Sequence, residues 1–148
     1  MFHIFGARET GAKPGFGLAG AFINDINNAY PSATTEAIAY PANGQANLEN
    51  QTYKDSVRYG VGNATQQVAA FAKMCPDAKI VLVGYSQGSK FDARPSDQIH
   101  CGDFDDTIQL YCDADDEFCT NGTSLAIHNG YHGVYGKQAL AFVKSKLG

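Results

Sequence analysis

Short extended runs of apolar residues alternate with helical spacings along the first part of the chain. Residues 2–5 and residues 36–40 form two such runs, and each is followed by a residue that ends a strand. Between the runs, four apolar side chains recur at helical spacing ahead of a proline: Leu18, Phe22, Ile23 and Ile26. The pattern therefore predicts a strand, a helix and a second strand, in that order.

A longer helix and a buried strand follow. Over residues 53–74 the apolar side chains fall at steps of three and four, which is typical of a helix with one buried face. Residues 80–83 read Ile-Val-Leu-Val, which predicts a strand buried on both faces of a parallel sheet. Residues 107–111 favour another strand, and residues 135–147 favour a closing helix. This alternation indicates an α/β fold with a mostly parallel central sheet flanked by helices.

The composition limits the classes of partner. The 148 residues, 44% of them hydrophobic, suit one globular domain over residues 1–148. With 11 basic and 15 acidic side chains the net charge is -4, so we expect no nucleic-acid partner, because attraction to phosphate needs positive charge. No apolar stretch reaches the ~18 residues of a transmembrane helix, so we expect no membrane partner.

Several features favour an exported protein. Cys112 and Cys119 are close enough in sequence to close a short disulfide loop, and disulfides persist in oxidising compartments. Three sequons for N-glycosylation also occur, at Asn50, Asn63 and Asn121. Because the first residues lack a signal peptide, either the leader was removed or the start is artificial.

A serine flanked by glycines directly follows the predicted buried strand. Residues 84–88 read Gly-Tyr-Ser-Gln-Gly and fit the pattern G-x-S-x-G. In this pattern the glycines allow a turn between strand and helix that is too tight for nearby side chains, and the turn exposes the hydroxyl of Ser86 at the edge of the sheet. The simpler alternative is a glycine-rich strand end with a solvated serine.

To act as a nucleophile at neutral pH, a serine hydroxyl needs a base and an orienting carboxylate. Three acidic residues lie inside the loop between the two cysteines: Asp115, Asp116 and Glu117. Two histidines, His128 and His132, follow them. The chain order can therefore be Ser, Asp, His, which is the α/β-hydrolase order. The alternative is that these acids form a solvated turn.

At these residues the sequence resembles the cutinase and acetylxylan esterase family of secreted fungal serine esterases. The resemblance covers nearly all of the chain and is closer to the acetylxylan esterases. It rests on five segments: 3–10 (HIFGARET), 80–88 (IVLVGYSQG), 111–116 with Cys119 (YCDADD), 128–131 (HNGY) and 135–143 (YGKQALAFV). The resemblance implies a cutinase-like α/β-hydrolase that cleaves carboxylic esters through a covalent acyl-enzyme.

The resemblance also assigns roles to individual residues. The family nucleophile falls on Ser86. The family aspartate, four residues after the first cysteine of its small loop and three before the second, falls on Asp116. The family histidine, followed two or three residues later by a tyrosine, falls on His128. The family's oxyanion donors fall on Gln87 and on Thr10.

The implied reaction is the removal of acetyl groups from xylan, outside the cell, by a monomer that needs neither cofactor nor metal. The implied partner is a polysaccharide or a small ester. Two alternatives stay open at this point. One is a cutinase that acts on longer-chain or polymeric esters, and the other is a shortened, catalytically inactive member of the family.

The chain departs from the family directly after the serine motif. Between Gly88 and Phe91 family members carry a helix, a further strand and another connection, so one strand–helix unit is expected to be missing here. Pro95 limits the helix after the serine to little more than two turns. Either the strand around Ile108 then takes the place beside residues 80–83, or an apolar edge and sheet face are exposed.

Two further motifs imitate cofactor sites. Residues 15–20 satisfy G-x-G-x-x-G, but a dinucleotide site requires this motif at the end of the first strand, and nine residues separate it from Phe5. Two cysteines and two histidines resemble a set of zinc ligands, but the number of residues between them does not suit a zinc site: Cys112, Cys119, His128 and His132. We therefore expect neither group.

Overall fold

The computed structural model describes residues 1–44, 51–89 and 102–148. The chain divides into two compact units, Met1–Phe91 and Asp92–Gly148. A single domain over residues 1–148, shortened between 88 and 91, stays a prediction. The sequon at Asn50 lies outside the described residues.

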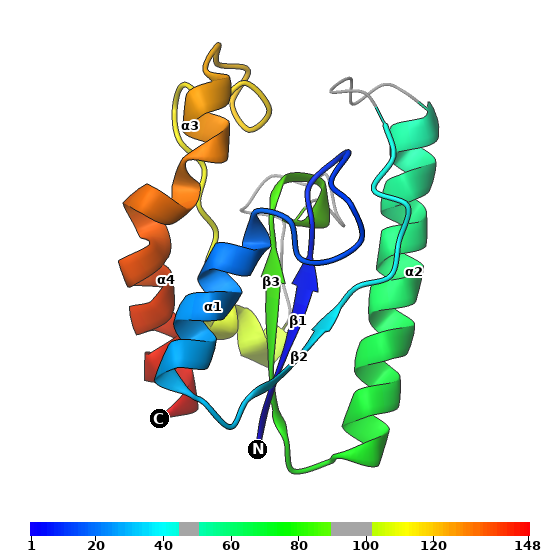
Figure 1. Cartoon of the computed structure of the whole chain (residues 1–148), viewed down its shortest axis with the longest axis vertical. Helices are drawn as coiled ribbons and strands as arrows, with labels where there is room; N and C mark the ends of the chain where they lie inside the picture. Colours follow the sequence, from blue (N-terminus) through cyan, green and yellow to red (C-terminus); the bar gives the residue numbers. More distant parts are fainter. Residues whose placement is uncertain (45–50, 90–101) are drawn as a thin grey trace. The chain divides into compact units, whose positions relative to one another are not determined.

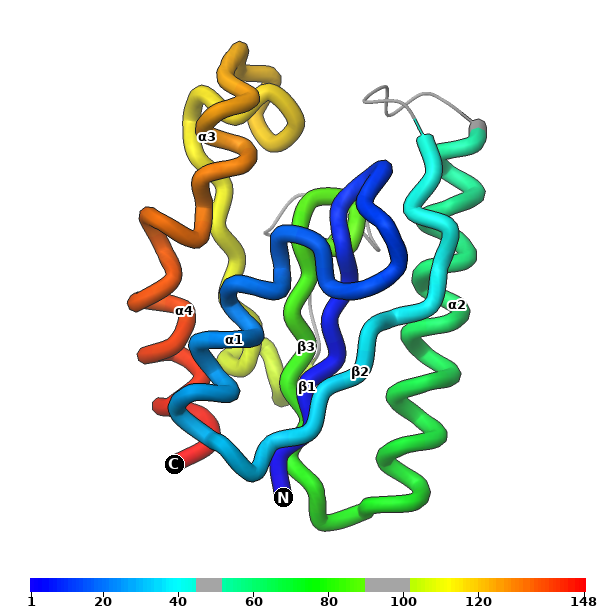
Figure 2. The backbone as a smooth tube through the Cα atoms, viewed as in Figure 1, coloured from blue at the N-terminus to red at the C-terminus, as the bar shows by residue number. Residues whose placement is uncertain are grey.

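The first unit is built on a parallel sheet whose central strand is the first in the chain. The strand order is β2-β1-β3, with β1 at Phe2–Ala7, β2 at Thr34–Ala37 and β3 at Lys79–Gly84. Both outer strands run parallel to β1, which lies between them in Figure 2. The predicted parallel sheet is therefore confirmed.

Two helices cover opposite faces of this sheet (Figure 1). They are α1, Ala19–Ala29, and α2, Gln51–Met74. Neighbouring side chains of a strand point to opposite faces, and β1 shows both environments. Phe5 packs against Phe71 of α2, with ring centroids 5.9 Å apart. On the other face, a Cβ on Gly6 would lie 2.5 Å from Ile23 of α1. The helical patterns of the sequence thus mark the faces that bury the sheet.

Strand β2 ends earlier than residues 36–40 predict. Beyond its last residue the Ala39 N–H donates to Gln67 Oε1 over 2.9 Å, and the Ala39 carbonyl accepts from the Asn63 side chain. Side chains of α2 therefore satisfy backbone groups that a longer strand would have paired. The amide of Asn63, half-buried on that helix, is engaged in this contact, whereas the sequon residue Asn121 is exposed.

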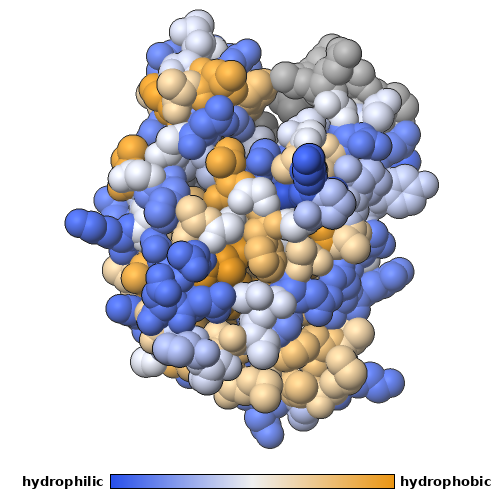
Figure 3. Space-filling view, in the orientation of Figure 1, coloured by the Kyte–Doolittle hydropathy of each residue, from blue (hydrophilic) through white to orange (hydrophobic). Residues whose placement is uncertain are grey.

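Strand β3 is exposed where the sequence predicts burial on both faces. Leu82 is 65% exposed, and β1 is the only described strand that pairs with β3. The turn that follows, η1 at Ser86–Ser89, is a 3-10 helix, and Pro95, expected to limit the helix after the serine, lies outside the described residues. The burial prediction is therefore wrong, because no described strand occupies the place beyond β3. Apolar surface also lies among hydrophilic side chains on the face drawn in Figure 3.

The second unit consists of helices and the loops that connect them. Its helices are η3, Gly102–Thr107, α3, Leu125–Asn129, and α4, Tyr131–Leu147. The predicted closing helix is confirmed and starts one turn earlier than expected. The predicted strand at residues 107–111 is wrong: Leu110 is 44% exposed, and these residues pair with no described strand. A strand is stabilised by its ladder, which local sequence does not reveal. None of the described helices is long and apolar enough to cross a bilayer.

His3 is a titratable residue in the core between β1 and α2. Its ring stacks on Phe71 with centroids 4.0 Å apart, and its Nδ1 lies 2.7 Å from Thr34 Oγ1. Burial lowers the pKa of His3, and the charge of Glu36, 3.8 Å away, opposes this only in part. The unfolded chain therefore binds the proton more readily than the folded chain does.

We expect stability to fall as the pH drops below the ordinary histidine pKa of about 6.5. His3→Phe should flatten this dependence, and Glu36→Gln should steepen it, because Glu36 opposes the lowering of the pKa. Urea unfolding between about pH 7 and about pH 5 measures the free energy of unfolding for each variant. An identical slope in wild type and His3→Phe would show that His3 is not the group responsible.

Candidate active site

Ser86 lies in a strained turn at the end of β3. Its φ is +51°, in the left-handed region that residues other than glycine rarely adopt. A Cβ on Gly88 would lie 2.2 Å from the carbonyl oxygen of Ala7. A Cβ on Gly84 would lie 2.4 Å from the carbonyl oxygen of Gly88. Close backbone approach therefore requires both glycines, as in a nucleophile turn.

Thr10 and Gln87 meet beside this turn. The Gln87 side chain is fully buried, and its Nε2 donates a hydrogen bond of 3.0 Å to Thr10 Oγ1. The backbone N–H of Gln87 precedes the first hydrogen bond of η1, which runs from the Gly88 N–H to the Tyr85 carbonyl over 2.9 Å. N–H groups at the start of a helical turn have no partner inside it. The first unit therefore places a hydroxyl and an N–H donor near the serine.

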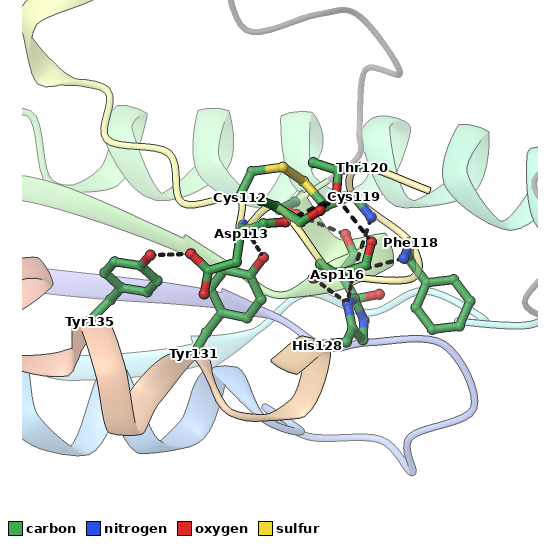
Figure 4. Close-up of a disulfide and its surroundings, with 12 residues drawn as sticks. Cys112, Asp113, Asp116, Phe118, Cys119, Thr120, His128, Tyr131 and Tyr135 are labelled. Atoms are coloured by element: carbon green, nitrogen blue, oxygen red, sulfur yellow. Dashed lines mark hydrogen bonds and ion pairs between the residues drawn. A yellow bond between two sulfur atoms is a disulfide. The ribbon is translucent and has the colours of Figure 1, made fainter. Parts of the chain in front are cut away.

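In the second unit a buried carboxylate holds His128. Its Nδ1 lies 3.0 Å from Oδ1 and 2.9 Å from Oδ2 of Asp116, which is 1% exposed. An ionised carboxylate can only accept hydrogen bonds, so Nδ1 carries the proton of the neutral ring. Nε2 of that ring is then the nitrogen that can accept a proton. Figure 4 shows the two side chains facing each other.

Several donors keep Asp116 ionised. Burial by itself raises the pKa of its carboxyl, but hydrogen bonds from His128, from the Phe118 N–H and from Tyr131 outweigh burial and lower the pKa. The N–H groups of Phe118 and Cys119 lie 2.7 Å and 3.0 Å from Oδ1. The ionised carboxylate of Asp116 therefore stabilises the folded state at neutral pH. This contribution is lost as the pH falls through the lowered pKa of Asp116.

A disulfide and two tyrosines fix the loop that carries Asp116. Cys112 and Cys119 are bonded, with Cα atoms 5.9 Å apart (Figure 4). From α4, the hydroxyl of Tyr131 accepts the Asp113 N–H over 2.8 Å, and the hydroxyl of Tyr135 donates to the Asp113 carboxylate. Burial raises the pKa of Tyr131, so its hydroxyl stays protonated and can donate to Asp116.

Replacing both bonded cysteines by serine should lower the free energy of unfolding by about 2 kcal/mol. The effect is modest because the disulfide closes a short loop and therefore removes little conformational entropy from the unfolded chain. The replacement should also loosen the position of Asp116, because the Cys119 N–H in this loop donates to its carboxylate. Thermal unfolding measures the first effect. Cys75→Ser is the matched control, because Cys75 is a free thiol and its replacement removes no cross-link. Equal unfolding temperatures for the double variant and wild type would contradict the prediction.

The structure distinguishes the predicted residues from their alternatives within the second unit. Asp115 is exposed and accepts the Thr123 N–H over 3.1 Å, as part of a turn. Glu117 is exposed, and His132 is half-buried on α4. Among residues 1–44, 51–89 and 102–148, no group of three His, Cys, Asp or Glu side chains could hold a metal. The catalytic roles of the predicted residues stay predictions at this point.

Two supporting residues escape the sequence reading. Tyr131, whose hydroxyl bonds to the Asp113 N–H and to Asp116, is three residues after His128, and this spacing is the signal that could have identified it. Ser56 on α2 is 2% exposed and its Oγ donates to Gln87 Oε1 over 2.7 Å. No local pattern identifies it, because its partner is 31 residues away.

Known proteins resemble this chain over nearly its whole length. The cutinase family model matches residues 1–95 and 92–147. "Acetylxylan esterase 2" of Talaromyces purpureogenus is 37% identical over 202 residues, covering 99% of this chain and 86% of that protein. "Cutinase 11" of Verticillium dahliae is 35% identical over 203 residues, covering 98% of this chain and 68% of that protein. A solved acetylxylan esterase has a TM-score of 0.88 and 35% identity, covering 99% of this chain and 98% of that one.

The match to the Talaromyces relative is longer than the chain, so this chain lacks residues that the relative carries. The match to the Talaromyces protein runs over 202 residues although this chain has 148. The family model matches in two segments that meet at residues 92–95. The position of the missing unit between 88 and 91 stays a prediction, but the family does not depend on it. Since the family model and relatives above 30% identity span nearly all of the sequence, the chain belongs to the cutinase family and has its α/β fold.

Proposed function

We propose that this cutinase-family esterase removes acetyl groups from xylan, with Ser86 as the nucleophile. The observation that carries the proposal is the buried pair of Asp116 and His128, since it fixes the tautomer in which Nε2 can act as a base. The left-handed turn at Ser86 supports the other half of the chemistry.

In the first step the Oγ of Ser86 attacks the carbonyl carbon of the ester. His128 takes the hydroxyl proton on Nε2, and Asp116 stabilises the imidazolium that forms. A tetrahedral intermediate results, with negative charge on the former carbonyl oxygen. Its collapse releases the sugar hydroxyl, which receives the proton from His128, and leaves an acetyl group on Ser86.

The backbone N–H of Gln87 and the hydroxyl of Thr10 form the oxyanion hole, the pair of donors that stabilises the negative oxygen. A single fixed donor of this kind is typically worth about 10²–10³ in rate. The hydrogen bond between Gln87 Nε2 and Thr10 Oγ1 holds the two residues together before substrate binds.

Water then attacks the acetyl group, again with His128 as the base. The products are acetate and free Ser86. In both steps of the reaction every proton moves between Ser86, His128 and the reacting groups. The proposed reaction therefore proceeds without a cofactor or a metal.

The choice of acetyl esters of xylan follows the relatives. The names of the Talaromyces protein and of the solved structure both state acetylxylan esterase. The Verticillium relative is named a cutinase, so turnover of longer-chain esters is the competing specificity. We further propose that the protein acts outside the cell, since the disulfide between Cys112 and Cys119 suits an oxidising compartment.

Labelling with a serine-directed phosphonate tests the mechanism. We expect one covalent adduct on Ser86, located by peptide mass spectrometry, in folded protein and not in urea-unfolded protein. If folded protein gives no adduct, the chain is a catalytically silent member of the family.

Acyl-chain preference tests the substrate class separately. We expect kcat/KM for p-nitrophenyl acetate to exceed that for the butyrate and longer esters, with acetate released from acetylated xylan. Faster turnover of the long-chain esters would replace the xylan assignment by a cutinase activity and leave the mechanism unchanged.

A further inference from the structure

We propose that Ser56 is a positioning residue for the oxyanion hole, because it fixes the amide of Gln87 and thereby the direction of the Thr10 hydroxyl. The inference rests on the proposed function, in which Gln87 and Thr10 stabilise the negative oxygen. Ser56 lies on α2 and is 2% exposed, so it cannot contact a polysaccharide itself. Its influence must pass through Gln87.

The direction of the hydrogen bonds around Ser56 follows from its neighbours. The Asn43 N–H lies 3.0 Å from Ser56 Oγ and can only donate, so Oγ accepts there. A hydroxyl has one proton, and Ser56 gives it to Gln87 Oε1 over 2.7 Å. The Asn43 carbonyl, 3.1 Å from Gln87 Nε2, can only accept, so it places Oε1 on the side of Ser56 and makes Ser56 the donor to Gln87.

The Gln87 amide is oriented by this donation. With Oε1 toward Ser56, the two protons of Nε2 reach Thr10 Oγ1 over 3.0 Å and the Asn43 carbonyl over 3.1 Å. A reversed amide would set Oε1 against the Asn43 carbonyl and leave Nε2 beside the hydroxyl of Ser56. In this orientation both protons of Nε2 and the oxygen Oε1 of the buried amide each have a partner.

Thr10 then has its proton available for the substrate. Its Oγ1 accepts from Gln87, so its single hydroxyl proton points away from the amide. If Oε1 faced Thr10 instead, it would take that proton and the oxyanion would lose a donor. Ser56 therefore acts on the reaction through the orientation of two other side chains.

The kinetic test is Ser56→Ala, assayed on p-nitrophenyl acetate. Losing the orientation of a donor should lower kcat by about 10- to 100-fold, somewhat less than removal of the donor itself, with KM nearly unchanged. Tyr59→Phe is the matched control, because it removes a hydroxyl from a residue of the same helix that is 63% exposed. It should keep wild-type kcat.

A double-mutant cycle separates positioning from general stability. Thr10→Val removes the hydroxyl and keeps the shape of the side chain. In that background Ser56→Ala should change kcat by less than twofold, because the proton it directs is gone. A full additional loss in the Thr10→Val background would overturn the inference.

A second readout does not need activity. In wild type the Gln87 side-chain amide should exchange slowly and show NMR contacts to the Thr10 methyl group, and Ser56→Ala should lose both features. Should Ser56→Ala not fold, Ser56→Cys keeps the volume with a weaker donor and should show faster exchange. An unchanged Gln87 amide in a folded variant would overturn the inference.

The two failures can be told apart. If wild type neither labels with phosphonate nor hydrolyses esters, the proposed function fails, and the amide exchange still decides whether Ser56 orients Gln87. If wild type is active and Ser56→Ala keeps full kcat, only the role of Ser56 fails.

Discussion

Ser86→Ala should lower kcat for acetyl ester hydrolysis by about 10⁶, to the level of the oxyanion donors and binding alone. The variant keeps the turn but has no oxygen to attack the carbonyl carbon. Initial rates on p-nitrophenyl acetate measure the loss, and the folded state is checked by circular dichroism. KM should change little, since the hydroxyl contributes mainly to the transition state.

Ser145→Ala is the matched serine control. Ser145 is exposed on α4, and its Oγ donates to the Phe142 carbonyl over 2.7 Å within its own helix. Its loss should leave kcat within twofold of wild type. A Ser86→Ala protein that retains even a hundredth of the wild-type rate would show that another residue is the nucleophile.

Asp116→Asn should lower kcat by about 10⁴, because it reverses the tautomer of His128. Oδ1 of Asp116 accepts the N–H groups of Phe118 and Cys119, so the amide oxygen of asparagine must stay in that position. The amide NH₂ then takes the place of Oδ2 and faces His128 Nδ1, which lies 2.9 Å from it in the wild type. We expect Nδ1 to accept from this NH₂, although Oδ1 also lies 3.0 Å away, and the proton to move to Nε2.

With its proton on Nε2, His128 cannot act as the base. NMR of ¹⁵N-labelled histidine should show the change of tautomer directly, beside the loss of rate. Asp115→Asn is the control. Asp115 directly precedes Asp116 in the chain, but it is exposed and accepts a hydrogen bond from the Thr123 N–H in the turn described above. An Asp116→Asn protein with the wild-type tautomer and rate would remove Asp116 from the mechanism.

The helices α1, α2 and α4 and the strands β1 and β3 could be predicted from local patterns. Residues 53–74 bury one face at helical spacing, and the structure has a helix over Gln51–Met74. The pattern works here because the same side chains that set the periodicity also make the contacts with the sheet. The end of β2 could not be placed, because side chains of α2 compete for its backbone.

The errors concern strands and their neighbours. Residues 107–111 have the composition of a strand but pair with no described strand, and the apolar run at 80–83 leaves Leu82 exposed. In both cases the sequence shows which residues would suit a buried sheet. It left open whether the strand around Ile108 takes the place beside residues 80–83 or an apolar edge is exposed, and the described residues agree with the second.

The sequence by itself determined the family, the parallel α/β plan and the five residues proposed for catalysis: Thr10, Ser86, Gln87, Asp116 and His128. These depend on short motifs, whose residue types and spacing are visible along the chain. Only the tertiary structure decided that Asp116 rather than Asp115 is buried against His128, and that Ser56 holds the amide of Gln87. Such contacts join residues that are distant in sequence, and a buried polar group acquires its role from the donors and acceptors that folding brings to it.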